Sequence, residues 1–137
     1  MSHITAAQFT DRFASLILAG RELPKKHMDR HILFISSTLR LEAGRPYSES
    51  ELNDELRKWA SRFGVNFGLD HVTLRRFLVD EGYLRRDPAG GAYEVAMNGL
   101  PYTYDQSIKE LDLEELISAA RQARELKKQQ YLKRSQP

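Results

Sequence analysis

The chain contains no cysteine, so disulfide bonds and thiolate metal sites are excluded. It also lacks any apolar run close to the roughly 20 residues that a membrane span needs. The most apolar stretch, ASLILA at 14–19, is short and has charged residues on both sides. A secretory signal has a basic start and a longer apolar middle, so we expect no such signal here. These absences favour a cytoplasmic location.

A strong excess of one charge sign is also missing. The net charge is only +2, whereas domains that bind nucleic acids are usually distinctly basic. The charge is uneven, however: basic residues prevail in 24–45 and 121–137, and acidic residues prevail in 88–120. Any binding of a polyanion must therefore come from a local patch. The 137 residues, 41% of them hydrophobic and 29% charged, suit one soluble domain.

Hydrophobic spacing predicts a chain of helices interrupted by one β-hairpin. Helices are expected over 5–19, 25–39, from Ser48 onward, over 70–81 and from 112 onward. Strands are expected over 83–87 and 92–96, around a turn at Pro88–Gly91. Ser48 and Glu51 form a capping box, Asp70 caps the next helix, and Gly82 ends it. Gly64 and Gly68 are expected to bracket a loop, and Tyr102 and Tyr104 to lie in another.

Three helices followed by a two-stranded hairpin is the element order of a winged helix. We therefore expect a mostly α (α+β) fold with a winged-helix-like three-helix core, a two-stranded β wing, and accessory helices at both ends. The predicted division is an N-terminal accessory helix at 1–22, a winged-helix-like domain at 23–97, and a linker with a C-terminal helix and basic tail at 98–137. In such a domain the third helix can enter a DNA major groove while the wing touches flanking phosphates.

Helix 70–81 has a core side and a side open to a ligand. At 100° per residue, Leu74, Phe77 and Leu78 cluster on the core side. Arg75 lies at the border, and bracing the wing is its structural alternative. Arg85 and Arg86 are adjacent in a strand and face opposite ways, so one of them is available to DNA and the other opposes Glu94 or solvent. The candidate nucleic-acid-binding residues are Lys25, Lys26, His71, Thr73, Arg75, Arg76 and Arg86.

Three blocks of sequence, GRPYSESELNDEL, DHVTLRRFLVDEGYLRRD and GGAYEV, together carry a family resemblance. The first is similar to a Tyr-Ser/Thr-Glu-x-Glu-Leu-Asn pattern and the second to Asp-His-x-Thr-Leu-Arg-Arg-x-Leu-Val-Asp. The chain resembles, over about residues 23–95, the uncharacterised bacterial family called domain of unknown function two-zero-eight-seven. Members of that family occur alone or fused behind helix-turn-helix regulator domains, so the resemblance implies a role related to transcription.

Other chemistry finds less support in the sequence. His27 and His31 are four residues apart on a helix, but a metal site needs a third ligand, and the sequence offers only scattered candidates such as Asp29, His3 and His71. Two solvent-facing histidines are the commoner outcome, so neither a metal nor another cofactor is predicted. No nucleophile elbow, phosphate-binding glycine loop or H-E-x-x-H motif is present, and we expect no enzyme activity.

Two hypotheses of function remain open. One is a DNA-binding, transcription-regulator-like protein acting on double-stranded DNA. The other is a protein–protein interaction or dimerisation module with no role in nucleic-acid binding. For a homodimer through the terminal helices, the candidate interface is the apolar stripe of the first helix and that of the last: Phe9, Phe13, Leu16, Ile17, and residues 113–123.

Overall fold

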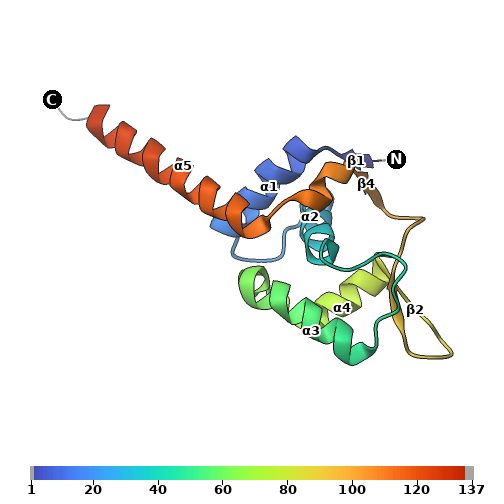
Figure 1. The fold of residues 1–137 in the computed structure, drawn as a ribbon. Helices are drawn as coiled ribbons and strands as arrows, with labels where there is room; N and C mark the ends of the chain where they lie inside the picture. The colour runs from blue at the N-terminus through green and yellow to red at the C-terminus, as the bar shows by residue number, and fades with distance from the viewer. Residues whose placement is uncertain (1, 135–137) are drawn as a thin grey trace.

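The computed structural model describes residues 2–134 as five α-helices, four short strands and three tighter or wider helical turns (Figure 1). In chain order these are β1 (Ser2–Ile4), α1 (Ala6–Ala19), α2 (His27–Thr38), α3 (Glu49–Trp59), a π-helical turn (Ala60–Gly64), a 3-10 turn (Val65–Phe67), α4 (His71–Asp80), β2 (Leu84–Arg86), β3 (Tyr93–Val95), β4 (Tyr102–Tyr104), a 3-10 turn (Gln106–Glu110) and α5 (Leu113–Arg134).

The helix starts follow directly from their capping residues. Thr5 and Ser48 each form a complete capping box, with Gln8 and Glu51 three residues on. Asp70 accepts a hydrogen bond from the backbone N–H of Thr73 at 2.7 Å and so caps α4. The predicted starts at Ser48 and Asp70 are thereby confirmed. Gly82, with a φ of 88°, takes the left-handed conformation that ends α4 and turns the chain into the hairpin.

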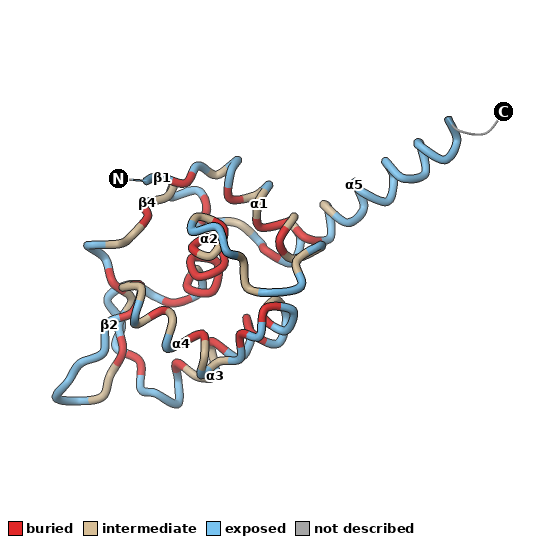
Figure 2. Tube along the Cα trace, turned by 180° about the vertical axis from the view of Figure 1, so that it is seen from behind, coloured by how far each residue is buried: buried red, intermediate tan, exposed pale blue. Residues whose placement is uncertain are grey.

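Helix α2 is the centre of the molecule. Every residue from His31 to Thr38 is buried, as the solid red coil in Figure 2 shows. Helix α1 packs on one side of it, and α4, itself packed on α3, lies on the other. A single buried cluster extends from Ile4 to Ile117, so the terminal elements share the core of the central unit.

The hairpin has a third participant. Strands β2 and β3 pair antiparallel, with Leu84 opposite Val95 and Arg85 opposite Glu94. Tyr47, in the connection between α2 and α3, bridges to Tyr93 through two backbone hydrogen bonds of 2.8 Å. The hairpin is therefore attached to the start of α3 as well as to the end of α4. The predicted mostly helical α+β fold, with three central helices before the hairpin, is confirmed.

Two predictions about connecting segments were wrong. Tyr102 and Tyr104 lie in β4, which pairs in parallel with β1, 100 residues earlier in the sequence, so they are not loop residues. The segment between Gly64 and Gly68 is not an open loop either, because α3 continues as a π-helical turn and then a 3-10 turn. Long-range strand pairing of three residues leaves little trace in local sequence periodicity, which explains the first error.

The apolar side chains of α1 and of the first turns of α5 pack against the core of the same molecule. Phe9 and Phe13 are completely buried, and α1 packs against both α2 and α5. Beyond its first turns, α5 extends away from the body as a long exposed arm (Figure 1). Within residues 2–134, none of the helices combines the length and apolar character that crossing a bilayer requires. Residues 135–137 of the predicted basic tail lie outside the described residues.

Candidate functional site

Helix α4 presents a narrow polar strip to solvent. Leu74 and Leu78 are completely buried against the core, which turns Val72 and Arg76 outward. Thr73 is half-buried beside the cap, and Asp80 is exposed one turn beyond Arg76. No ion pair joins Arg76 to Asp80 or to another acid among the described residues, so the guanidinium group is open to a ligand.

Arg75 points into the structure instead of toward solvent. Its Nη1 donates to Oδ1 of Asn53 at 2.6 Å, and its Nη2 lies 3.2 Å from a carboxylate oxygen of Glu49. The guanidinium carbon also lies 5.8 Å from the centre of the Tyr93 ring, and the side chain is only 17% exposed. Arg75 thus connects α4 to α3 and to β3. This is the bracing role that the sequence offered for Arg75 as the alternative to DNA contact.

The two hairpin arginines, Arg85 and Arg86, point to opposite faces of the strand, as adjacent strand residues do. Arg85 lies opposite Glu94 and donates to the carbonyl oxygen of Asn98 at 3.0 Å. Arg86 is exposed, and its guanidinium carbon lies 5.7 Å from the centre of the Tyr93 ring. Because Arg75 and Arg86 both contact Tyr93, the free arginine of the hairpin lies close to α4.

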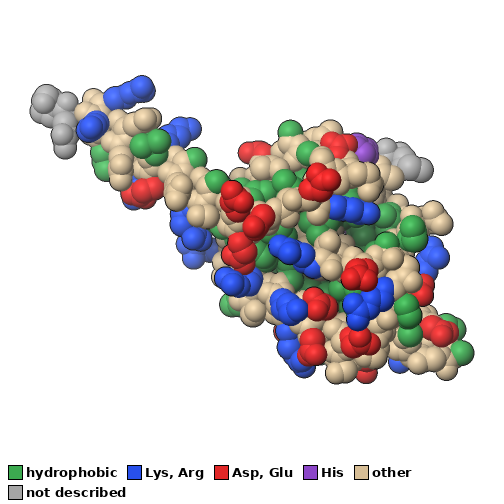
Figure 3. Space-filling model, viewed as in Figure 1, with side chains coloured by type: hydrophobic (Ala, Val, Ile, Leu, Met, Phe, Trp, Pro, Cys, Tyr) green, Lys and Arg blue, Asp and Glu red, His purple; other side chains and the backbone are tan. Residues whose placement is uncertain are grey.

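The remaining predicted residues are spread more widely. His71 begins α4, and its Nε2 lies 3.4 Å from Nη2 of Arg57, with which it lines a shallow hollow between α3 and α4. Lys25 and Lys26 are exposed in the segment before α2, outside both α4 and the hairpin. The surface over α3 is mixed, with acidic and basic side chains interspersed (Figure 3). Arg76, Arg86 and His71 therefore lie on α4 and on the hairpin that follows it, whereas Lys25 and Lys26 lie on a separate segment.

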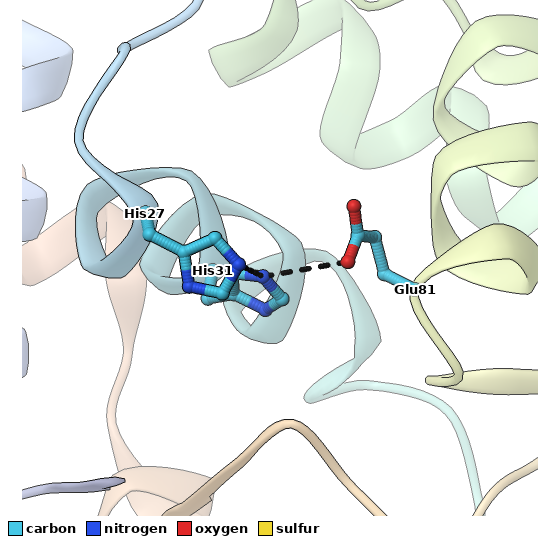
Figure 4. Close-up of side chains that lie close together, drawn as sticks. All are labelled: His27, His31 and Glu81. Atoms are coloured by element: carbon cyan, nitrogen blue, oxygen red, sulfur yellow. Dashed lines mark hydrogen bonds and ion pairs between the residues drawn. The ribbon is translucent and has the colours of Figure 1, made fainter.

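A second polar cluster lies between α2 and the end of α4. His27 and His31 lie one turn apart on α2 with their rings tilted by 44°, and their Nε2 atoms are 3.2 Å from each other. Glu81, directly after α4, places a carboxylate oxygen 3.5 Å from Nε2 of His31 (Figure 4). The expectation of two solvent-facing histidines is wrong for His31, which is 1% exposed because α2 is covered here by the α4–hairpin junction and by β4.

The other ring nitrogens of both histidines face tyrosines. Nδ1 of His31 lies 2.6 Å from the hydroxyl of Tyr83, and Nδ1 of His27 lies 2.9 Å from the hydroxyl of Tyr102. Burial, with smaller contributions from electrostatic repulsion by His27 and Arg30, lowers the pKa of His31 to about 4. Burial also raises the pKa of Tyr83. His31 is thus held as a neutral imidazole at neutral pH.

Glu81 was missed among the candidate third ligands, and so were the two tyrosines. Asp29, one of the residues considered, instead forms a bidentate pair with Arg12 on α1 at 3.0 and 3.1 Å. No local pattern could identify Glu81, because it is 50 residues away from His31 in the sequence. The one sequence feature that bears on Glu81 is Gly82, which indicates that α4 ends there and so places Glu81 at the end of the helix.

Comparison with known proteins gives one family. The sequence model of DUF2087, described as an uncharacterized protein conserved in bacteria, matches residues 21–95. This range runs from the segment before α2 to the end of β3, more than half of the chain. Neither the curated proteins nor the solved structures contain a match.

Arg75 is held by contacts within the fold whereas Arg76 is exposed, and this difference can be tested by measuring the free energy of unfolding of variants. Replacing Arg75 with Ala removes two charge-assisted contacts and leaves Asn53 without its donor, so unfolding should become easier by about 1–3 kcal/mol. Replacing the exposed Arg76 with Ala should change the unfolding free energy by less than about 0.5 kcal/mol. Urea unfolding of both variants measures this. Equal effects of the two substitutions would contradict the bracing role of Arg75.

Neutral His31 makes the fold sensitive to acid. The unfolded chain binds a proton on this histidine near its ordinary pKa of 6.5, whereas the folded chain does so only near a pKa of about 4. The contribution to stability is therefore complete above about pH 6.5 and is lost as the pH falls toward 4, with about 2 kcal/mol lost between about pH 7 and pH 5. Urea unfolding with a chelator present should show this loss in the native chain. His31→Gln should flatten the dependence, and an unchanged slope would disprove the assignment.

Proposed function

The chain belongs to the DUF2087 family of uncharacterized bacterial proteins, and from that premise we propose that it is a non-enzymatic, winged-helix-like protein that binds double-stranded DNA in a regulatory role. Helix α4 is assigned to the major groove and the β2–β3 hairpin to the flanking backbone. A cytoplasmic location accompanies this proposal, because that is where bacterial DNA is found.

The observation that carries the proposal is the exposure of two arginines, Arg76 and Arg86, on neighbouring elements. One extends from α4 and the other from the hairpin, and neither has an acidic partner among residues 2–134. Unpaired guanidinium groups on two adjacent elements suit the phosphates on either side of a groove. The hairpin is fixed relative to α4, since Tyr93 bonds to Tyr47 and is covered by Arg75.

The predicted residues then take different roles. Arg76 and Arg86 contact phosphate or base edges, with Thr73 and His71 beside them at the start of α4. Arg75 positions α4 and does not bind DNA itself, because its two terminal nitrogens, Nη1 and Nη2, already contact Asn53 and Glu49 of α3. Lys25 and Lys26 supply a longer-range attraction from the segment before α2. With a net charge of only +2, affinity depends on this local patch.

Salt dependence tests the proposal. The native chain should bind a random-sequence DNA duplex at about 50 mM salt and much more weakly at about 200 mM, since phosphate binding releases counterions. The double variant Arg76→Ala with Arg86→Ala should bind more weakly, and the slope of log affinity against log salt should fall by roughly 1–2. Fluorescence anisotropy of a labelled duplex measures both quantities.

Arg62→Ala is the matched control. Arg62 is exposed and pairs with Glu114 at 3.4 Å, on a different part of the surface, so this variant loses positive charge without altering α4 or the hairpin. It should bind DNA as the native chain does. If the native chain does not bind at low salt, or if Arg62→Ala weakens binding as much as the double variant, the proposed interface is wrong.

We propose self-association as the second candidate function, through the projecting part of α5. All residues of this helix from 121 to 134 are exposed, including Leu126 at 57%. A helical segment of this length is marginal in water without packing, so a partner would stabilise it. In an antiparallel pair with a second copy, the basic projecting part of one α5 would lie along the acidic first turn of the other, where Glu114 and Glu115 are exposed.

Light scattering over a concentration series tests this candidate. The full chain should approach twice the mass of one chain as its concentration rises, and the dimer should weaken with salt. A chain ending at Arg124 should remain monomeric, because it lacks the projecting part of α5. The control Gln129→Ala keeps the helix and its charges, so it should dimerise normally. A full chain that stays monomeric at every concentration rules out this candidate.

A further inference from the structure

Three side chains from two distant parts of the sequence converge beside α2. His27 and His31 share one face of that helix, and Glu81 approaches from the end of α4 (Figure 4). One nitrogen of each imidazole and one carboxylate oxygen lie within 4.8 Å of one another. The spacing of the two histidines, four residues apart, is the helical spacing that places two imidazoles on one metal ion.

The separations between these atoms fit coordination of a small ion. At a metal–nitrogen distance of about 2.0–2.1 Å, tetrahedral geometry separates adjacent ligand atoms by about 3.3 Å. The two Nε2 atoms are 3.2 Å apart, and Nε2 of His31 is 3.5 Å from the oxygen of Glu81. These two distances lie on either side of the tetrahedral value. The third separation, between the His27 nitrogen and the Glu81 oxygen, is within 4.8 Å, so the carboxylate would have to move toward His27 to complete the site.

The surroundings hold both rings in the orientation that a metal needs. Each Nδ1 faces a tyrosine hydroxyl, Tyr102 for His27 and Tyr83 for His31. When Nδ1–H donates to the phenol oxygen, the proton is fixed there and the Nε2 lone pair remains available. Ring orientation by a hydrogen bond from the second nitrogen is typical of histidines that bind metals.

A hydrogen bond between the two histidines is the simpler explanation of their closeness. It accounts for the 3.2 Å contact but not for Glu81, whose oxygen at 3.5 Å is too far for a good hydrogen bond to His31. A bound cation accounts for all three groups at once. We propose that His27, His31 and Glu81 form a binding site for a divalent transition-metal ion, with Zn²⁺ as the ion that fits best.

The ligand set decides the class of ion. Two imidazoles with one carboxylate suit Zn²⁺ and its neighbours, whereas Mg²⁺ and Ca²⁺ require sites made of oxygen ligands. The side chain of Glu81 is 34% exposed and His27 is exposed, so the ion can enter from solvent and retain a water as its fourth ligand. His31 closes the inner side of the site.

A metal at this position would join α2 to the junction between α4 and the hairpin. Glu81 directly follows α4 and is separated from β2 by two residues, and Tyr102 adds β4 to the assembly. The ion would therefore stabilise the packing of three elements, and this consequence is independent of whether α4 binds DNA. Stability and metal affinity are accordingly the properties to measure.

Calorimetric titration of the full chain with Zn²⁺, after removal of metals by a chelator, tests the site near pH 7.5. The native chain should bind one Zn²⁺ and gain thermal stability from it, and Mg²⁺ should do neither. His27→Gln and Glu81→Gln should each raise the Kd for Zn²⁺ by more than about tenfold, while Tyr102→Phe should raise it by about tenfold through loss of ring orientation. Co²⁺ should give the visible absorption of a four-coordinate ion in the native chain but not in His27→Gln or Glu81→Gln.

His71→Gln is the matched control, because it removes a histidine from α4 without altering the cluster, and it should bind Zn²⁺ as the native chain does. Since His27 is exposed, its variant should fold normally, which circular dichroism verifies. The proposal is overturned if no Zn²⁺ binds, if His27→Gln and Glu81→Gln bind as tightly as the native chain, or if His71→Gln weakens binding equally. The cluster would then be a pair of hydrogen-bonded histidines.

Discussion

Burial of α2 is the constraint around which the other elements are arranged. Its residues from His31 to Thr38 are all enclosed, so every neighbouring element must cover part of a helix that also carries polar side chains. Ser36, Ser37 and Thr38 meet this requirement by donating to backbone carbonyls three residues earlier. The indole of Trp59 donates to Ser36 at 2.9 Å, which attaches α3 to α2. Within residues 2–134, no buried side-chain nitrogen or oxygen is left without a partner.

The same requirement explains how a histidine came to lie in the core. His31 is buried with both ring nitrogens facing polar atoms, one at Tyr83 and the other at His27 and Glu81. These groups belong to α2, to the end of α4 and to the start of β2, so satisfying one imidazole also fixes where the hairpin leaves the helix. A polar network that joins three elements specifies their positions more closely than apolar packing alone.

The hairpin is positioned from two directions. Gly82 turns the chain at the end of α4, and the Tyr47–Tyr93 bridge attaches the returning strand to the start of α3. Arg75 closes this arrangement by contacting Asn53, Glu49 and the ring of Tyr93. As a result, Arg76 and Arg86 are held on adjacent elements, while the histidine cluster lies between α2 and the junction of α4 with the hairpin. The two proposed sites share one rigid helix but use different residues of it.

The sequence by itself determined the helices, their caps, the hairpin and the family, because capping boxes, glycine turns and apolar spacing act within a few residues. It also supplied the candidate arginines, and it left bracing of the wing open as the structural alternative for Arg75. Only the tertiary structure decided that Arg75 and Asn53 meet, that Tyr102 belongs to a strand, and that Glu81 reaches His31. Those contacts join residues 22 to 100 positions apart, where chain periodicity carries no information and packing alone chooses the partners.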